Sequence, residues 1–170
     1  KALRDISEKH GVEYFTSAVG EVNVVEKMKA VNAVIGGEGN GGVIYPELHY
    51  GRDALVGIAL FLSHLATSKK SMSSLRAQYP NYVISKNKIQ LEDGMDVKHI
   101  IAQIAEKYKQ YPQNTIDGLR IDIEDDWIHL RSSNTEPIIR IYAESSTEQT
   151  ANAMTHKMQM DITAVLDKSN

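Results

Sequence analysis

Three helices are predicted in the first part of the chain. One lies before Gly11 and another over residues 21–32, because the apolar residues of each segment recur on one helical face. A third is predicted over residues 54–66, where the Asp53 carboxylate can accept the free amide protons of the first turn. This third helix is apolar on nearly every side, so we expect it to pack against more than one neighbour.

Short apolar segments between these helices predict strands. They lie at residues 12–15, 33–35 and 43–45, and the second of them reads as buried. Helices and strands that alternate along a chain are typical of an α/β layer structure. We therefore predict an incomplete α/β domain with a mixed sheet.

The pattern changes after a polar segment that ends at Pro80. A strand near residues 82–91 is followed by an amphipathic helix over 96–110, then by three strands, and by a helix that begins at Ser146 with Gln149 completing a capping box. The order β-α-β-β-β-α predicts a small α+β domain with a four-stranded antiparallel sheet and two helices on one face. We place the boundary near 78–82, giving domains 1–80 and 81–170.

Composition restricts the classes of function. The net charge is −3, whereas non-specific binding to nucleic acid or acidic lipid needs an excess of Lys and Arg, so we expect neither nucleic acid nor membrane as a partner. The chain has no Cys, which suits a cytoplasmic protein. Its longest apolar run, residues 54–62, is far shorter than the ~20 residues that span a bilayer.

The segment Gly36-Gly37-Glu38-Gly39-Asn40-Gly41-Gly42 contains a literal G-x-G-x-x-G. A dinucleotide site needs a helix directly after the third Gly, and Pro46 excludes an uninterrupted one. A plain strand connection that uses glycines for positive φ angles is the simplest alternative. Glu38 and Asn40 favour a third interpretation, because a carboxylate held among glycines suits the hydroxyl donors of a sugar.

A second candidate site is the loop Arg131-Ser132-Ser133-Asn134-Thr135. Between two strands it can direct backbone amides, hydroxyl donors and a bidentate guanidinium toward one point, and Arg140 can add a second cation. These groups suit a phosphate monoester. The alternative is an exposed polar hairpin loop.

With both loops, the chain resembles the carboxy-terminal half of the α-D-phosphohexomutases, the superfamily of phosphoglucomutase, phosphomannomutase and phosphoglucosamine mutase. Gly37 to Gly42 takes the place of that family's Gly-Glu-x-Ser-Gly-His loop. Arg131 to Pro137 matches its phosphate-binding Arg-x-Ser-x-Thr-x-Pro pattern. The chain also starts at Lys1 rather than Met, so we expect a fragment.

The resemblance implies most of domain 3 and all of domain 4 of a four-domain phosphotransferase of the isomerase class. A phosphoserine on domain 1 would exchange phosphate with a hexose or hexosamine phosphate through a bisphosphate intermediate, and domain 2 would hold Mg²⁺. Both belong to the upstream polypeptide, so the resemblance implies an inactive fragment without a metal site of its own.

Carried across residue by residue, the resemblance gives Glu38 and Asn40 to the sugar. It gives the distal phosphate to the following residues: Arg131, Ser133, Asn134, Thr135 and Arg140. Gly42 stands where the family often has a His, and His49 is a candidate to replace it in proton transfer. The loop looks most like that of phosphoglucosamine mutases, while phosphoglucomutase or phosphomannomutase, a non-catalytic sugar-phosphate module and a nucleotide-binding domain stay open.

Overall fold

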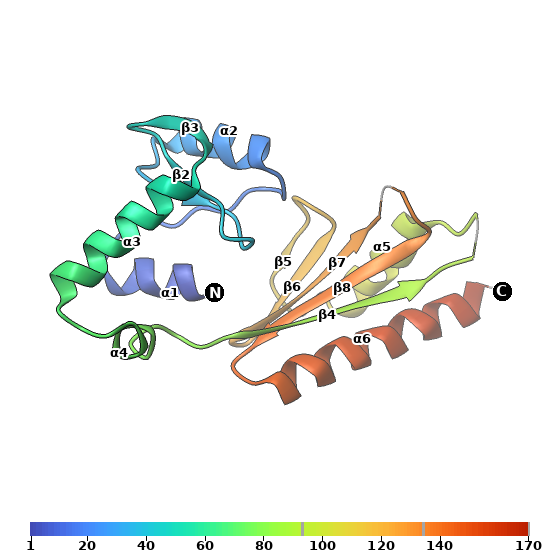
Figure 1. The fold of residues 1–170 in the computed structure, drawn as a ribbon. Coiled ribbons are helices and arrows are strands. Elements are labelled where there is room, and N and C mark those ends of the chain that lie inside the picture. Colours follow the sequence, from blue (N-terminus) through green and yellow to red (C-terminus); the bar gives the residue numbers. More distant parts are fainter. Residues whose placement is uncertain (93, 134, 170) are drawn as a thin grey trace. The chain divides into compact units, whose positions relative to one another are not determined.

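The computed structural model describes residues 1–92, 94–133 and 135–169, except the side chains of Lys168 and Ser169. The chain divides into two compact units, Ala2–Pro80 and the residues from Asn81 onward. In the first unit, two helices precede three consecutive strands, and two further helices follow them (Figure 1). Its elements are α1 (Ala2–Lys9), α2 (Glu21–Val31), β1 (Gly36–Gly37), β2 (Val43–Tyr45), β3 (His49–Arg52), α3 (Ala54–Ser68) and α4 (Met72–Arg76).

The strands of the first unit form a small antiparallel sheet in the order β1-β2-β3. The predicted α/β class is confirmed, but the predicted mixed sheet is wrong for the described residues, since both pairings are antiparallel. Residues 12–15 form no strand. The strand predicted at 33–35 starts instead at Gly36, and Val34 is 79% exposed. An apolar run identifies a buried strand only if a partner covers it.

The predicted helices of this unit are confirmed, and their ends have local causes. Asp53 caps α3 by accepting a hydrogen bond from the Val56 N–H at 3.0 Å. Asn32 ends α2 in a left-handed conformation with φ 53°. The prediction that α3 packs against more than one neighbour is confirmed, because α3 contacts both β2 and α4, although Leu55 is 78% exposed and other apolar side chains of α3 are also exposed.

The second unit is built on a five-stranded antiparallel sheet of order β4-β8-β7-β6-β5 (Figure 1). Four strands were predicted, and the fifth is a two-residue edge strand that apolar spacing cannot reveal. Its elements are β4 (Val83–Gln90), α5 (Val97–Lys107), β5 (Gln113–Asn114), β6 (Leu119–Ile123), β7 (Asp126–Ser132), β8 (Ile138–Ser145) and α6 (Glu148–Ser169).

Alternate residues of this sheet form one continuous core with both helices. Fully buried members include Leu130 of β7, Ile141 of β8, Ile104 of α5 and Ile162 of α6. The prediction of two helices on one sheet face is therefore confirmed. Because a strand's side chains alternate between faces, the residues between these core positions lie on the opposite, polar face.

The start of α6 differs from the prediction. The Thr147 hydroxyl accepts a hydrogen bond from the Thr150 N–H at 3.1 Å, one residue beyond the predicted pair of Ser146 and Gln149. Ser146 and Thr147 can each cap a helix through a side-chain hydroxyl, so the sequence alone did not decide between these adjacent residues.

Candidate functional site

The Gly-rich segment closes a tight connection between β1 and β2. The Glu38 N–H donates to the Gly42 carbonyl and the Gly41 N–H donates to the Glu38 carbonyl, both at 3.1 Å. A Cβ at Gly37 would overlap the Gly42 carbonyl oxygen, so the backbone needs glycine there. A strand, not a helix, follows Gly42, so the context of a dinucleotide site is absent.

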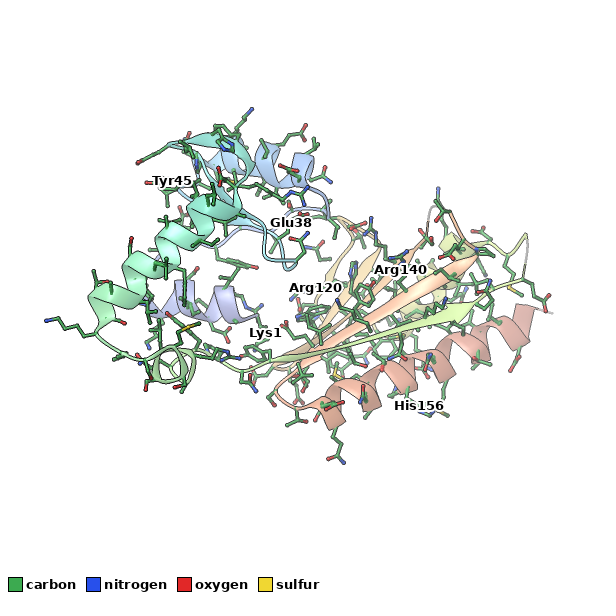
Figure 2. All side chains as sticks on the ribbon, in the orientation of Figure 1. Lys1, Glu38, Tyr45, Arg120, Arg140 and His156 are labelled. Atoms are coloured by element: carbon green, nitrogen blue, oxygen red, sulfur yellow. The ribbon has the colours of Figure 1, made fainter. Side chains whose placement is uncertain are left out.

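Within this loop, the Glu38 side chain is held by polar contacts and only 15% exposed (Figure 2). Its Oε2 accepts a hydrogen bond from Asn40 Nδ2 at 3.2 Å and pairs with Arg52 Nη1 at 3.6 Å. Asn40 Oδ1 in turn accepts the Gly42 N–H at 3.0 Å. Asn40 therefore braces both the carboxylate and the backbone of the loop.

Arg52 connects the loop to the start of α2. Its Nε donates to Glu21 Oε2 at 2.9 Å, and its backbone N–H donates to Glu21 Oε1 at 3.1 Å. The backbone N–H of Arg52, and then its positive charge, hold the pKa of Glu21 below the ordinary value. We did not identify the contact between Arg52 and Glu21 from the sequence. Arg52 reaches the loop only because it pairs with Ile44 in the sheet.

His49 lies at the other end of the same hairpin, paired with Tyr45. Its Nε2 is 3.1 Å from Asp53 Oδ2. The pKa of Asp53 is lowered, first by the Val56 backbone N–H and then by His49. The proton-transfer role of His49 remains a prediction, and in the structure its recorded partner is the cap of α3.

The second predicted site is the short connection between β7 and β8. The Ser133 N–H donates to the Ile138 carbonyl at 3.1 Å, and Ser133 Oγ is 3.4 Å from Thr135 Oγ1. The Thr135 N–H points to Ser133 Oγ at 3.4 Å. Two hydroxyl groups therefore lie side by side at the sheet end, whereas the predicted Asn134 lies outside the described residues.

Three cations stand in a row beside this loop, on the polar face of the sheet. Arg131 pairs with Arg140 across β7 and β8, and Arg140 pairs with Lys88 across β8 and β4. Like charges directly opposite one another destabilise a sheet. Arg131 Nε pairs with Asp117 at 3.2 Å, but no described carboxylate lies within ion-pair distance of Lys88 or Arg140.

We call Lys88, Arg140 and Arg131 the cation row. Among the described residues, one carboxylate accompanies these three positive charges, so the row has an excess of positive charge that an anion would neutralise. Arg131 and Arg140 were predicted, whereas Lys88 was missed. Lys88 lies 43 residues before Arg131 in the sequence, and only the register of β4 with β8 places it opposite Arg140.

Comparison with known protein families identifies the family to which this chain and its two loops belong. Residues 1–82 match the phosphoglucomutase/phosphomannomutase alpha/beta/alpha domain III, and residues 88–159 match the carboxy-terminal domain of the same proteins. The chain belongs to the phosphoglucomutase/phosphomannomutase family. The predicted resemblance is thereby confirmed.

Named relatives in this family cover most of the chain. It is 38% identical over 151 residues to a phosphoglucomutase/phosphomannomutase of Thermococcus kodakarensis. The alignment covers 88% of this chain and 33% of that protein. It is 37% identical over 159 residues to the phosphoglucosamine/phosphogalactosamine mutase of Sulfurisphaera tokodaii, with 92% and 35% covered. The chain thus spans about a third of the length of these relatives.

Solved structures of the family share the fold. A phosphoglucomutase/phosphomannomutase family protein of Burkholderia thailandensis matches with a TM-score of 0.75 and 25% identity, over 96% of this chain and 35% of that one. The Aspergillus fumigatus N-acetylphosphoglucosamine mutase in complex with GlcNAc-6P and magnesium matches with a TM-score of 0.61 and 13% identity, over 96% and 38%. That identity supports the fold alone.

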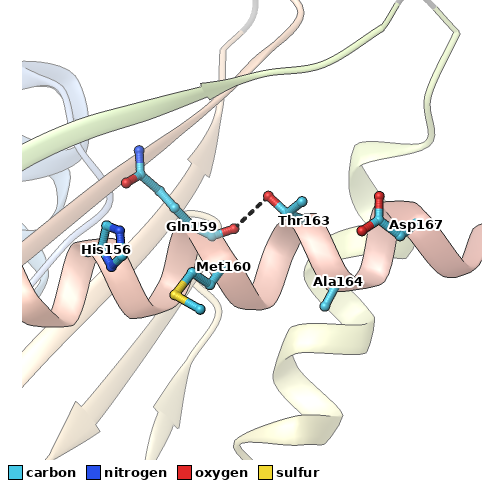
Figure 3. Close-up of a pocket in the computed structure, with 6 residues that line it drawn as sticks. All are labelled: His156, Gln159, Met160, Thr163, Ala164 and Asp167. Carbon is cyan, nitrogen blue, oxygen red and sulfur yellow. Dashed lines mark hydrogen bonds between the residues drawn. The ribbon is translucent and has the colours of Figure 1, made fainter.

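The described part of this family member offers no metal centre. Among the residues that the structure describes, no group of three or more Asp, Glu or His side chains is placed to hold an ion. A hollow on α6 is lined by residues of that helix only, among them His156, Gln159 and Asp167, and contains none of the predicted site residues (Figure 3). None of the described helices is long and apolar enough to cross a membrane.

Proposed function

We propose that this chain supplies the sugar-binding and distal-phosphate-binding loops of a phosphohexomutase. The full-length protein would interconvert the 6-phosphate and 1-phosphate of a hexose or hexosamine. The observation that carries the proposal is the cation row beside the hydroxyls of Ser133 and Thr135, because three adjacent cations with one carboxylate suit a phosphate dianion. The family membership of the chain supports it.

The two loops take different parts of the substrate in this proposal. Glu38 accepts hydrogen bonds from ring hydroxyls, with Asn40 bracing it. Arg131, Arg140, Ser133 and Thr135, together with Asn134, hold the phosphate that is not reacting. A bisphosphate intermediate that reorients needs one clamp for either phosphate and one sugar contact that works in both orientations.

The reacting groups lie elsewhere in the proposed enzyme. In this proposal the phosphoserine and the magnesium ion belong to domains 1 and 2, upstream in the same polypeptide, as the family resemblance implies. Residues 1–80 and 81–170 are the proposed domains 3 and 4. This chain by itself would bind the substrate's sugar and phosphate groups without turning it over.

The proposed substrate is glucosamine phosphate. The Sulfurisphaera tokodaii relative is named for phosphoglucosamine and phosphogalactosamine, and a Methanocaldococcus jannaschii relative, 32% identical, is named phosphoglucosamine mutase. Glucose and mannose phosphates are the alternatives, since the Thermococcus kodakarensis relative carries those names. A non-catalytic sugar-phosphate module is the remaining candidate, because the proposed binding loops belong to this chain and the proposed reacting groups do not.

Turnover by the full-length enzyme tests the proposal. We expect the highest kcat/KM with glucosamine 6-phosphate when it is compared side by side with glucose 6-phosphate and mannose 6-phosphate. A preference for glucose or mannose would move the proposal to that sugar. Absence of turnover with all three, together with a natural gene that lacks upstream serine and magnesium loops, would favour the non-catalytic module.

A further inference from the structure

The space beside Gly42 is occupied by the side chain of Arg52. A Cβ built at Gly42 would lie 2.8 Å from Cδ and 3.2 Å from Cγ of Arg52, closer than ordinary van der Waals contact. The same Cβ would lie 3.2 Å from Asn40 Oδ1. A side chain at position 42 and the present position of Arg52 therefore exclude each other.

Arg52 uses that space to hold two carboxylates at once. Its Nε and backbone N–H bind both oxygens of Glu21, while its Nη1 reaches Glu38 Oε2 at 3.6 Å. Glu21 thus anchors one edge of the Arg52 guanidinium, and the opposite edge lies beside the Glu38 carboxylate. A guanidinium is planar and rigid, so fixing one edge also fixes the direction of the other.

The contacts to Glu38 are unequal between its two oxygens. Asn40 and Arg52 both contact Oε2, and the described residues give Oε1 no partner. The carboxylate is therefore held by one oxygen, and the other remains available as an acceptor. This is the arrangement that a directed hydrogen bond from a sugar hydroxyl requires.

We propose that Arg52 is a positioning residue for Glu38: anchored by Glu21 and admitted by Gly42, it holds Oε2 so that Oε1 faces the sugar. This inference rests on the proposed function of Glu38. Arg52 acts through Glu38 rather than through the phosphate. Gly42 serves the same role, because its missing side chain leaves the room in which the guanidinium lies.

A double-mutant cycle in the full-length enzyme tests the role of Arg52. We expect Arg52→Ala to lower kcat/KM for the hexosamine phosphate about tenfold in the wild-type background and less than about twofold in the Glu38→Gln background. Arg52→Lys should recover only part of the loss, because an ammonium lacks the rigid planar group through which Nε binds Glu21 while Nη1 reaches Glu38. An equal loss from Arg52→Ala in both backgrounds would overturn the proposal.

Binding measurements allow the double-mutant cycle to be interpreted even if Glu38→Gln abolishes turnover. The dissociation constant of glucosamine 6-phosphate, measured by calorimetry for the four proteins of the cycle, should show the same non-additivity. Thermal unfolding separates a purely structural effect, since loss of fold would lower Tm equally in both backgrounds. Glu47→Gln is a matched control on the same hairpin, where Glu47 binds the Tyr45 hydroxyl at 2.8 Å, and it should leave kcat/KM unchanged.

A second cycle tests the coupling of positions 42 and 52. Gly42→Ala should lower kcat/KM in the wild-type background, because the new methyl group displaces Arg52, and should have little further effect in Arg52→Ala. Additive effects would show that Gly42 does not act through Arg52. If Glu38→Gln alone retains full activity, both the sugar-contact proposal and the Arg52 inference fail, whereas a loss in Glu38→Gln with additive Arg52 effects refutes only the inference.

Discussion

The two candidate loops balance charge in opposite ways. In the Gly-rich loop, Arg52 stands between the carboxylates of Glu38 and Glu21, so one cation faces two anions, and Asn40 adds a hydrogen bond to Glu38. Beside the β7–β8 loop, the described residues place one carboxylate next to the three cations of the cation row. A site left with excess negative charge suits a neutral group that donates hydrogen bonds, and one left with excess positive charge suits an anion.

This difference teaches which end of the substrate each loop can recognise. A hydroxyl donor needs a well-placed acceptor, so direction matters more there than total charge. A phosphate dianion gains from every nearby cation, and that part of its binding falls with ionic strength. The two loops should therefore respond differently to substitution and to salt, and four experiments on the full-length enzyme measure the difference.

The largest effect is expected from Arg131→Ala. Truncating a charged partner of a phosphate costs ~2–5 kcal/mol, so we expect kcat/KM to fall by at least about 30-fold and its salt dependence to become weaker. Steady-state kinetics at two ionic strengths provide the measurement. Arg120→Ala is the matched control, because Arg120 has its own partner in Asp122 at 2.7 Å, and it should stay within about threefold. Unchanged kinetics in Arg131→Ala would refute the phosphate assignment.

Glu38→Ala should have the next largest effect. Loss of a hydrogen bond to a charged acceptor costs ~1.5–3 kcal/mol, or about 10- to 100-fold in kcat/KM. The salt dependence of the enzyme should stay as in the wild type, since the cation row is intact. A salt response altered as strongly as in Arg131→Ala would remove the distinction between the two loops.

Lys88→Gln should reduce phosphate binding moderately. Its charge lies in the cation row but Lys88 is exposed to solvent, so we expect the inhibition constant of inorganic phosphate to rise about three- to fivefold. Lys86→Gln is the matched control on the same strand and face. Lys86 lies 5.8 Å from the ring centroid of Tyr142, opposite it in the sheet. Equal effects of the two substitutions would show that only the overall charge of the face matters.

The smallest effect is expected from His49→Asn. Because His49 binds the Asp53 cap of α3, we expect kcat to change by less than about threefold and Tm to fall slightly. Steady-state kinetics and thermal unfolding of the same preparation measure both quantities. A loss of 100-fold or more in kcat, with Tm unchanged, would instead assign His49 the proton-transfer role and add a chemical step to the Gly-rich loop.

Elements with strong local periodicity were predictable from the sequence. The amphipathic helix α5 and the alternating strands β6, β7 and β8 were placed within a few residues, because apolar spacing and capping are local properties. The same approach failed for residues 12–15 and 33–35, where an apolar run has no strand partner. It also missed β3 and the two-residue strand β5, which are defined by pairing rather than by composition.

The candidate site divides in the same way. Glu38, Arg131 and Arg140 were found because they stand in or beside motifs that are contiguous in the sequence. Arg52 and Lys88 were not, because each reaches its loop through a strand pairing. A cross-strand neighbour is chosen by register, and one residue of slip would move it to the opposite face.

By itself, the sequence determined the helix pattern, the two chemically distinct loops and the resemblance that the family comparison confirmed. Only the tertiary structure decided which charges accompany those loops. It placed Arg52 in the space beside Gly42 and aligned Lys88 with Arg140 and Arg131. The physical reason is that motifs are read from neighbours along the chain, whereas electrostatic partners are neighbours in space.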